Sequence, residues 1–289
     1  MAMAGITLCM IVRNEERSLA RCLDSVRPVV DQMIVVDTGS TDASRSIASG
    51  YGAAIYPFDF SRTDFAAARN HGLDRASGAW ILALDADETL HSESLPLVRG
   101  LAAGGENAGY YFERLNREPG SSRPRSDYVV RLFPNRPDYR YRGRVHETID
   151  AAILAGGGRL LRTEIRIEHD FAPDPEARRQ RNLRYIEILN EEIAADPGDH
   201  SRLTFLAAEY HQLGMFDQAA AVAERLARLR PLDPEAHLHA GVYHLMFQID
   251  HRQARADLME ALRLKPGYPE AISFLEMLDE REKSRKMQT

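Results

Sequence analysis

The sequence predicts an α/β domain with a mostly parallel sheet, followed by an all-α domain of helical repeats. In residues 1–172, short apolar runs of strand length alternate with helical patterns, and such alternation implies right-handed crossovers and a largely parallel sheet. Pro173-Asp174-Pro175 then interrupts the pattern. Residues 173–289 are predicted to be helical throughout, and similar helical units recur along them.

The first domain is expected to begin with strands and helices in alternation. The strands are predicted at residues 6–12, 32–36, 54–58 and 79–84, and the helices between them at 14–26, 41–51 and 64–76. The pattern changes from Gly109 onward. Segments 110–115, 128–133 and 160–169 alternate or run apolar, with turn residues between them, so we expect antiparallel strands that cover or extend the sheet.

The helical part contains recurring sequence units. Leu229-Arg230-Pro231 and Leu264-Lys265-Pro266 end two similar units, each preceded by an alanine-rich helix. The spacing of these units resembles that of the tetratricopeptide repeat (TPR). Because one helical hairpin cannot bury its apolar face alone, neighbouring units must stack. An unspecialised helical bundle is the alternative interpretation. Such a tail is expected either to bind a peptide in its groove or to form a homodimer.

The composition excludes several classes of protein. The chain has 289 residues, 44% hydrophobic and 28% charged, and a net charge of −6, which gives no electrostatic reason to expect nucleic acid as a partner. No apolar stretch has the length of a membrane span, so we expect no integral membrane segment. Cys9 and Cys22 lack metal-ligand spacing, which predicts reduced, buried thiols and a cytoplasmic location.

The segment from Gly78 to Glu88 joins an apolar strand to three carboxylates. Unpaired charges are costly to bury, so the strand is expected to present them at its carboxyl end, where ligands of open α/β sheets bind. Asp85 and Asp87 point the same way in an extended chain. Such paired oxygen ligands suit Mg²⁺ or Mn²⁺, which in turn bind a diphosphate. A solvated acidic turn is the alternative.

The second predicted strand ends in Asp37-Thr38-Gly39-Ser40-Thr41-Asp42. A carboxylate at a strand end, followed by glycine and hydroxyl residues, is suited to a nucleotide, because the carboxylate accepts hydrogen bonds from a base or ribose. Simple helix capping is the alternative. The segment lacks the three glycines of a dinucleotide fingerprint, which argues against a nicotinamide cofactor.

Four segments taken together resemble glycosyltransferase family 2, namely Ile11–Glu16, Asp37–Asp42, Ala68–Asn70 and Asp85–Glu88. The resemblance covers about residues 5–170. It implies a GT-A fold, a nucleotide-sugar donor, a divalent metal (Mg²⁺ or Mn²⁺) and inversion at the anomeric carbon. Residues 131–147, with the repeats after them, look like a subgroup that carries TPR-like tails. That subgroup includes enzymes that modify peptides and others that work on cell-surface glycans.

The resemblance also implies roles for particular residues. Asp37 resembles the carboxylate that reads the donor base, and Arg69 the basic residue beside it. Val12 and Glu15 follow the first strand, where the family lines its nucleoside pocket. Asp85 matches the aspartate near the ribose, and Asp87 the one that holds the metal.

An inverting transfer needs a base that takes the proton from the acceptor. Glu147 is the first choice, because it follows the strands on the acceptor side and stands after Val145-His146. Glu88 and Asp127 are the alternatives. His146 and His169 are the histidines expected to supply a further metal ligand or a diphosphate contact. Phosphate contacts are also considered for three arginines, Arg131, Arg142 and Arg144.

The predicted function is an inverting transfer from a nucleotide-sugar, with a UDP-sugar expected, to a peptide, protein or cell-surface glycan acceptor. The acceptor half lacks the Gln-x-x-Arg-Trp-type motif, which argues against a processive polysaccharide synthase. A hydrolase with paired carboxylates would leave the nucleotide pocket unexplained. A non-catalytic TPR scaffold with a degenerate domain is the other alternative, and the joint presence of Asp37, Arg69, Asp85 and Asp87 speaks against it.

Overall fold

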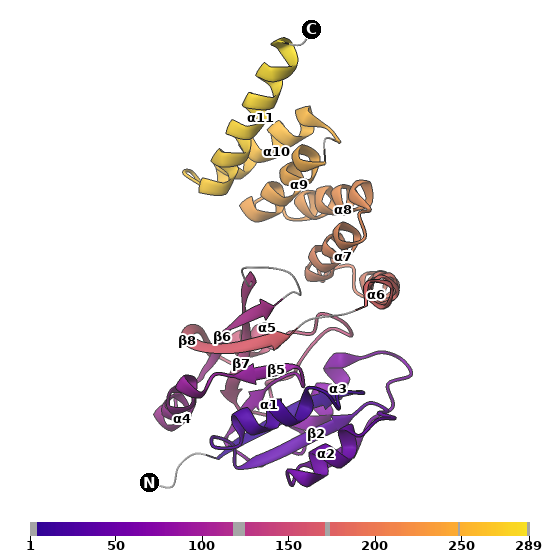
Figure 1. The fold of residues 1–289 in the computed structure, drawn as a ribbon. Coiled ribbons are helices and arrows are strands. Elements are labelled where there is room, and N and C mark those ends of the chain that lie inside the picture. Colours follow the sequence, from indigo (N-terminus) through magenta and orange to yellow (C-terminus); the bar gives the residue numbers. More distant parts are fainter. Residues whose placement is uncertain (1–4, 118–124, 171–173, 248, 288–289) are drawn as a thin grey trace. The chain divides into compact units, whose positions relative to one another are not determined.

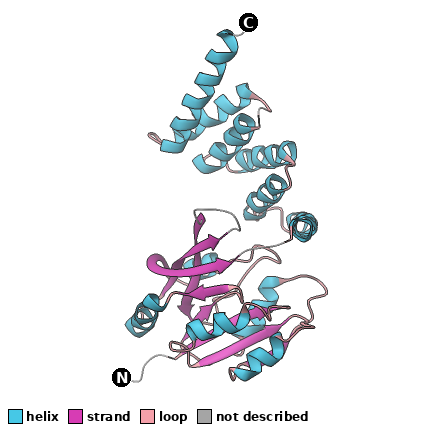
Figure 2. Cartoon of the chain, viewed as in Figure 1, coloured by secondary structure: helices cyan, strands magenta, loops and turns pink. Residues whose placement is uncertain are grey.

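The computed structural model describes residues 5–117, 125–170, 174–247 and 249–287. The chain divides into two compact units, Met1–Pro173 and Asp174–Thr289 (Figure 1). The described part of the first unit combines strands and helices, whereas that of the second is helical (Figure 2). Each unit is described separately below.

The first four strands form the parallel part of the sheet, as predicted. They are β1 (Ile6–Val12), β2 (Gln32–Asp37), β3 (Ala54–Pro57) and β4 (Trp80–Ala83), in the spatial order β3-β2-β1-β4. Helices α1 (Leu19–Val26), α2 (Ser44–Gly50) and α3 (Phe65–Leu73) connect them. The helices are shorter than the sequence pattern predicted. For α1 the reason is local, because Asn14 has a left-handed φ of 57° and the chain turns before the helix begins.

The second half of the sheet is mixed. It contains β6 (Ala108–Arg117), β7 (Arg125–Pro134), β8 (Arg159–Asp170) and the short β5 (Glu88–Leu90). Strand β7 pairs antiparallel with β4 and β6, as expected. The expectation of an antiparallel set is wrong for the pairing of β8 with β6, which is parallel, although β8 pairs antiparallel with β5. The connection from β7 to β8 includes helix α5 (Asp150–Ala155), and this longer path lets β8 join β6 instead of forming a hairpin with β7.

Two hydrophobic cores lie on opposite faces of the sheet, because side chains alternate along each strand. Leu8 and Met10 of β1 pack with residues of α1, α2 and α4 (Leu95–Gly104). Cys9, between them, packs on the other face with residues of α3 and α5. The sequence analysis did not predict α4, β5, α5 or the short 3₁₀ helix η1 (Ser92–Ser94).

The second unit consists of consecutive helices that pack on one another, as the repeat pattern predicted. They are α6 (Pro175–Ala195), α7 (Ser201–Gln212), α8 (Phe216–Leu229), α9 (Pro234–Met246), α10 (His251–Leu264) and α11 (Pro269–Met287). Asp233 caps α9 by accepting a hydrogen bond from the Glu235 backbone N–H, and proline follows it at the first helical position. None of the described helices of either unit is long and apolar enough to cross a bilayer.

Candidate functional site

The acidic segment after β4 forms a tight turn into β5. The backbone N–H of Glu88 donates to the Asp85 carbonyl at 3.0 Å. The side chain of Glu88 closes the turn from the other side, because its Oε2 accepts from the Asp85 backbone N–H at 3.0 Å. Glu88 is completely buried. The buried carboxylate of Glu88 therefore stabilises the turn through its hydrogen bond with the Asp85 backbone N–H.

Asp85 lies between two arginines from distant parts of the chain. Its Oδ1 accepts from Arg69 Nη2 of α3, and its Oδ2 from Arg131 Nη2 of β7, both at 2.7 Å. Burial alone would raise the pKa of Asp85, but the charges of Arg131 and Arg69 hold it well below its usual range. Arg131 also pairs with Glu88. Opposite charges thus compensate one another, which makes burial of these ions tolerable.

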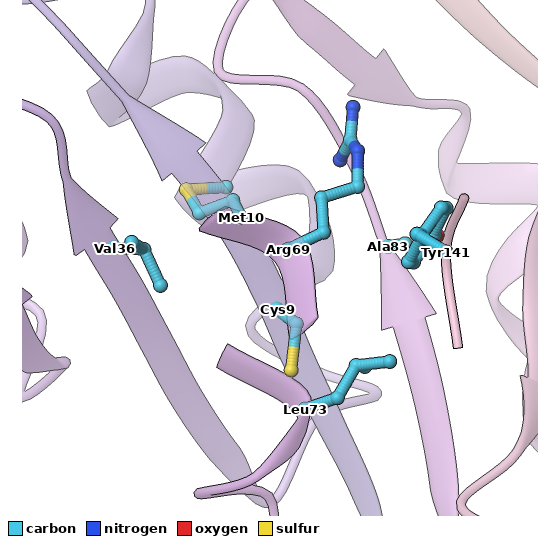
Figure 3. Close-up of a pocket in the computed structure, with 7 residues that line it drawn as sticks. All are labelled: Cys9, Met10, Val36, Arg69, Leu73, Ala83 and Tyr141. Carbon is cyan, nitrogen blue, oxygen red and sulfur yellow. The ribbon is translucent and has the colours of Figure 1, made fainter. Parts of the chain in front are cut away.

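Glu147 joins the same network through Arg69. Its Oε1 accepts from Arg69 Nε at 2.6 Å, and its side chain is 13% exposed. Within the described part of the chain, Oε2 of Glu147 makes no hydrogen bond. The ring of Tyr141 lies 5.4 Å from the Arg69 guanidinium carbon. Figure 3 shows Arg69 extending between Met10 on one side and Ala83 and Tyr141 on the other, beside a cavity of about 10 Å³.

Asp87, the last residue of the turn, faces β8. Its Oδ2 lies 3.2 Å from Nε2 of His169, whose Nδ1 lies 2.7 Å from Oδ1 of Asn116 on β6. In the sheet, His169 is the register partner of both Glu88 on β5 and Asn116 on β6. Burial alone would lower the pKa of His169, but the hydrogen bond to Asp87 and the negative charge of that residue raise it overall.

Asp127 belongs to the same group of residues. Arg114 donates two hydrogen bonds to its carboxylate, at 3.0 and 2.5 Å, and Asn116 Nδ2 donates a third at 3.2 Å. Burial alone would raise the pKa of Asp127, but the hydrogen bond and charge of Arg114 lower it. The structure therefore brings Asp127 and His169 together, with Asn116 between them.

The loops after β1 and β2 are tied to each other by hydrogen bonds. The Asn14 N–H donates to Ser40 Oγ at 3.1 Å, and Asn14 Oδ1 accepts from the Thr41 N–H at 2.8 Å. Gly39 has a φ of 101°, a backbone conformation in which glycine is favoured. The two loops therefore form one connected surface at the carboxyl ends of adjacent parallel strands.

The predicted nucleoside-binding residues lie along these loops. Val12 and Asp37 are register partners at the ends of β1 and β2. The Asp37 carboxylate is almost fully buried and accepts from the Ser40 N–H at 3.2 Å. The Glu15 N–H donates to Ser44 Oγ at 2.7 Å. Burial raises the pKa of the Glu15 carboxyl, and the nearby charge of Asp87 adds to this effect.

The other predicted residues occupy different surroundings. His146 has a left-handed φ of 50°. Arg144 donates to the backbone carbonyls of Arg62 and Thr63, and Arg142 is exposed. The described residues contain no group of three or more His, Cys, Asp or Glu side chains that could hold a metal. The pairing of Asp87 with His169 is thus a two-residue arrangement.

Sequence reasoning did not identify Arg114 and Asn116. On β6, Tyr110 and Phe112 are buried, and Arg114 and Asn116 continue the same face because side chains alternate. Polar residues at core-facing positions of a strand are the signal that would have pointed to them. Arg131 was considered for phosphate, but its guanidinium is engaged by Asp85 and Glu88.

The segments that build this group of residues match a known family. The model described as "Glycosyl transferase family 2" matches residues 7–169. The chain belongs to glycosyltransferase family 2. The matched part extends from β1 to His169 and so contains every element of the network described above. Together with the observed sheet topology, this membership confirms the predicted GT-A fold.

Relatives of this family 2 chain support both parts of the prediction. A TPR repeat-containing protein of Synechococcus elongatus is 43% identical over 154 residues, 53% of this chain and 38% of that protein. The SPbeta prophage-derived glycosyltransferase SunS of Bacillus subtilis is 23% identical over 222 residues, 74% of this chain and 51% of that protein. The chain therefore spans about half or less of the length of these two curated relatives.

The chain is also similar to a solved structure. This is glucosyl-3-phosphoglycerate synthase from Mycobacterium tuberculosis in complex with Mn²⁺, UDP and glucosyl-3-phosphoglycerate. The two share 17% sequence identity, and the similarity covers 60% of this chain and 74% of that chain with a TM-score of 0.42.

Proposed function

We propose that this family 2 glycosyltransferase transfers a sugar, with inversion, from a UDP-sugar to a peptide or protein acceptor. The observation that carries the proposal is that Asp87 lies beside His169, with 3.2 Å between Oδ2 and Nε2. Asp85, in the same turn as Asp87, binds two arginines from other elements. This turn follows β4, at the carboxyl end of the parallel strands, where open α/β sheets bind their ligands.

The donor nucleoside would occupy the connected loops after β1 and β2. Asp37, with its buried carboxylate, supplies acceptors for the N–H groups of a base, and the left-handed Gly39 allows the backbone to approach a ligand closely. Val12 and Glu15 flank this place. Arg69 is bound to Asp85 and Glu147, so we propose that it acts by orienting these two carboxylates.

Asp87 and His169 fit a divalent metal as a half-site. A carboxylate and an imidazole suit Mn²⁺ or Mg²⁺, which keeps its remaining positions for substrate phosphate and water. Asp87 and His169 would hold the ion, which when bound stabilises negative charge on the departing diphosphate. Asp85 is saturated by two arginines, so its proposed role lies beside the donor rather than in direct ligation.

Glu147 is our proposed base. Arg69 donates hydrogen bonds to both Glu147 and Asp85. The other carboxylate oxygen of Glu147, Oε2, makes no hydrogen bond within the described residues, so it is available to take the proton of the acceptor. Glu88 is completely buried, so it would not reach an acceptor. Asp127 is engaged by Arg114 and Asn116, and its lowered pKa makes it a weak base.

The second unit supports a peptide or protein acceptor over a glycan. It contains a groove of about 470 Å³ whose lining is mostly apolar and aromatic, including Val242, Tyr243, Phe247 and Phe274. Apolar side chains of a peptide match such a lining, whereas a glycan would leave hydroxyl groups without hydrogen-bond partners. Cys9 and Cys22 are free thiols, and we propose a reducing, cytoplasmic location on that ground.

Calorimetric titration with UDP tests the donor and metal parts of the proposal. UDP should bind the wild-type chain more tightly with Mn²⁺ than without it, and Asp87→Ala should abolish this difference. Glu113→Gln is a matched control, because Glu113 also lies on the second half of the sheet but pairs with the exposed Arg166. Absence of UDP binding under both conditions would instead indicate a scaffold with a degenerate domain.

A further inference from the structure

Asn116 connects two groups that the sequence left unrelated. Its Oδ1 lies 2.7 Å from His169 Nδ1, and its Nδ2 lies 3.2 Å from Asp127 Oδ1. We propose that Asn116 is a positioning residue for the metal site, which Asp127 orients and which fixes the ring of His169. This inference rests on the proposed function, because it assigns the amide a part in binding the proposed metal.

Asp127 decides which way the Asn116 amide faces. The two hydrogen bonds from Arg114, at 3.0 and 2.5 Å, hold Asp127 as an ionised carboxylate, which can only accept hydrogen bonds. The atom of Asn116 that faces Asp127 must therefore be the donor Nδ2. The acceptor Oδ1 is then turned toward His169, in agreement with the observed contact.

The orientation of the amide in turn selects the protonated nitrogen of His169. Because Oδ1 of Asn116 has no hydrogen to donate, Nδ1 of His169 must carry the proton. This leaves Nε2, which lies 3.2 Å from Oδ2 of Asp87, as the nitrogen that a metal would bind. Metal-binding histidines commonly donate their second N–H to a carbonyl or carboxylate in this way, and such partners fix both the tautomer and the ring orientation.

The sheet keeps these side chains in place. Arg114 and Asp127 are register partners on β6 and β7, and Asn116 and His169 are register partners on β6 and β8. The His169 side chain is 15% exposed, whereas that of Asp127 is 46% exposed. The contacts therefore lead from the partly exposed ion pair of Arg114 and Asp127, through Asn116, to the less exposed His169. These side chains lie along one face of the adjacent strands β7, β6 and β8.

The first test measures Mn²⁺ affinity, by electron paramagnetic resonance, in the presence of UDP. Asn116→Ala should weaken Mn²⁺ binding by about 10- to 100-fold, the usual effect of removing such a partner, while UDP affinity without metal stays unchanged. Glu113→Gln, on the same strand, is the control and should bind Mn²⁺ like the wild type. With Mg²⁺, ¹⁵N NMR should show protonated Nδ1 in the wild type and a loss of that single form in Asn116→Ala.

A double-mutant cycle separates positioning from a general effect on folding. Asp127→Ala removes the carboxylate that orients the Asn116 amide, so it should also weaken Mn²⁺ binding. The loss in the double variant Asn116→Ala/Asp127→Ala should be smaller than the sum of the two single losses, because the two positions are coupled. Asp127→Ala also serves if Asn116→Ala proves unstable.

The outcomes distinguish the inference from the proposed function. A wild-type chain that binds no Mn²⁺ with UDP would remove the metal from the proposed function, and the role of Asn116 with it. A wild-type chain that binds Mn²⁺, together with an equal affinity in Asn116→Ala, would overturn the inference alone. So would losses of Mn²⁺ affinity from Asn116→Ala and Asp127→Ala that add in full in the double variant.

Discussion

At the scale of single residues, the carboxylates of the site differ in their partners. Asp85 and Glu88 share Arg131, so their charges are compensated inside the sheet. Asp87, the carboxylate between them in sequence, instead faces His169. Neighbouring carboxylates of this motif therefore have different partners, with Asp85 and Glu88 bound to arginine and Asp87 to histidine.

Glu147→Gln is expected to separate binding from catalysis. If Glu147 is the base, the variant should retain its affinity for UDP and Mn²⁺, while kcat falls by about a hundredfold or more, the usual scale for loss of a general base. Steady-state kinetics with a working acceptor, together with calorimetry, provide both quantities. A normal kcat would assign the role to another carboxylate, and lost UDP binding would make Glu147 a structural partner of Arg69.

Burial of the Cys9 and Cys22 thiols should make them unreactive and should make the stability of the fold depend on pH. Burial raises the pKa of Cys9 from 9.0 to about 12, and that of Cys22 also well above its ordinary value. Ellman's reagent at pH 8 should therefore react with neither thiol in the native chain and with both in denaturant. Rapid labelling of the native chain would show that at least one of them is accessible.

The same shifts determine how stability changes in alkali. The folded state binds the thiol protons more tightly than the unfolded state, so this contribution is fully present below the unfolded pKa. It is lost as the pH rises from about 9 toward 12, the value given for Cys9. Denaturant melts of the Cys9→Ala variant should show a smaller loss of stability over this range than melts of the wild type.

At the scale of elements, two glycines inside helices should respond to alanine in opposite ways. Gly241 in α9 is buried, and a Cβ there would lie 2.8 Å from Leu258 Cγ and 3.1 Å from the Ala254 carbonyl oxygen of α10. Overpacking of this kind costs about 1–3 kcal/mol. Gly100 in α4 is exposed and has nothing within 4 Å of such a Cβ, so alanine should stabilise the helix by about 0.5–1 kcal/mol.

Chemical denaturation of Gly241→Ala and Gly100→Ala measures these two effects. Equal changes in both variants would mean that helix propensity, and not the close approach of α9 to α10, governs position 241. A stabilised Gly241→Ala would contradict the packing described for this pair of helices.

The two halves of the sheet differ in how far the sequence predicts their contacts. Strands β1, β2 and β4 are mostly apolar, and Val12 and Asp37 stand at the ends of adjacent parallel strands, so their proximity follows from the pattern. The contact of Arg114 with Asp127 depends on the register of β6 against β7, which the sequence does not specify. Strand β5 has three residues, too few for alternation to show. Consequently the closeness of the strand ends at Val12 and Asp37 was predictable, whereas the contacts that Asn116 makes with Asp127 and His169 were not.

For the molecule as a whole, the described residues of each unit form hydrophobic cores of their own. The first unit contains the two cores of its sheet, and the second contains one that includes Leu245, Leu258 and Leu278. We therefore expect two transitions in differential scanning calorimetry. UDP with Mn²⁺ should raise the melting temperature of one transition only, because a ligand stabilises the unit that binds it. A single transition that shifts as a whole would show that the units unfold together.

The cations that pair with Asp85 and Glu88 in the described structure are arginines, namely Arg69, Arg114 and Arg131. This preference extends through the chain, since lysine occurs only at positions 265, 283 and 286. Reagents that acylate amines therefore leave every side-chain cation of the first unit unmodified, because guanidinium groups stay protonated and are poor nucleophiles. Fluorescent labelling or surface immobilisation through these lysines should consequently attach within the second unit, at or after Lys265.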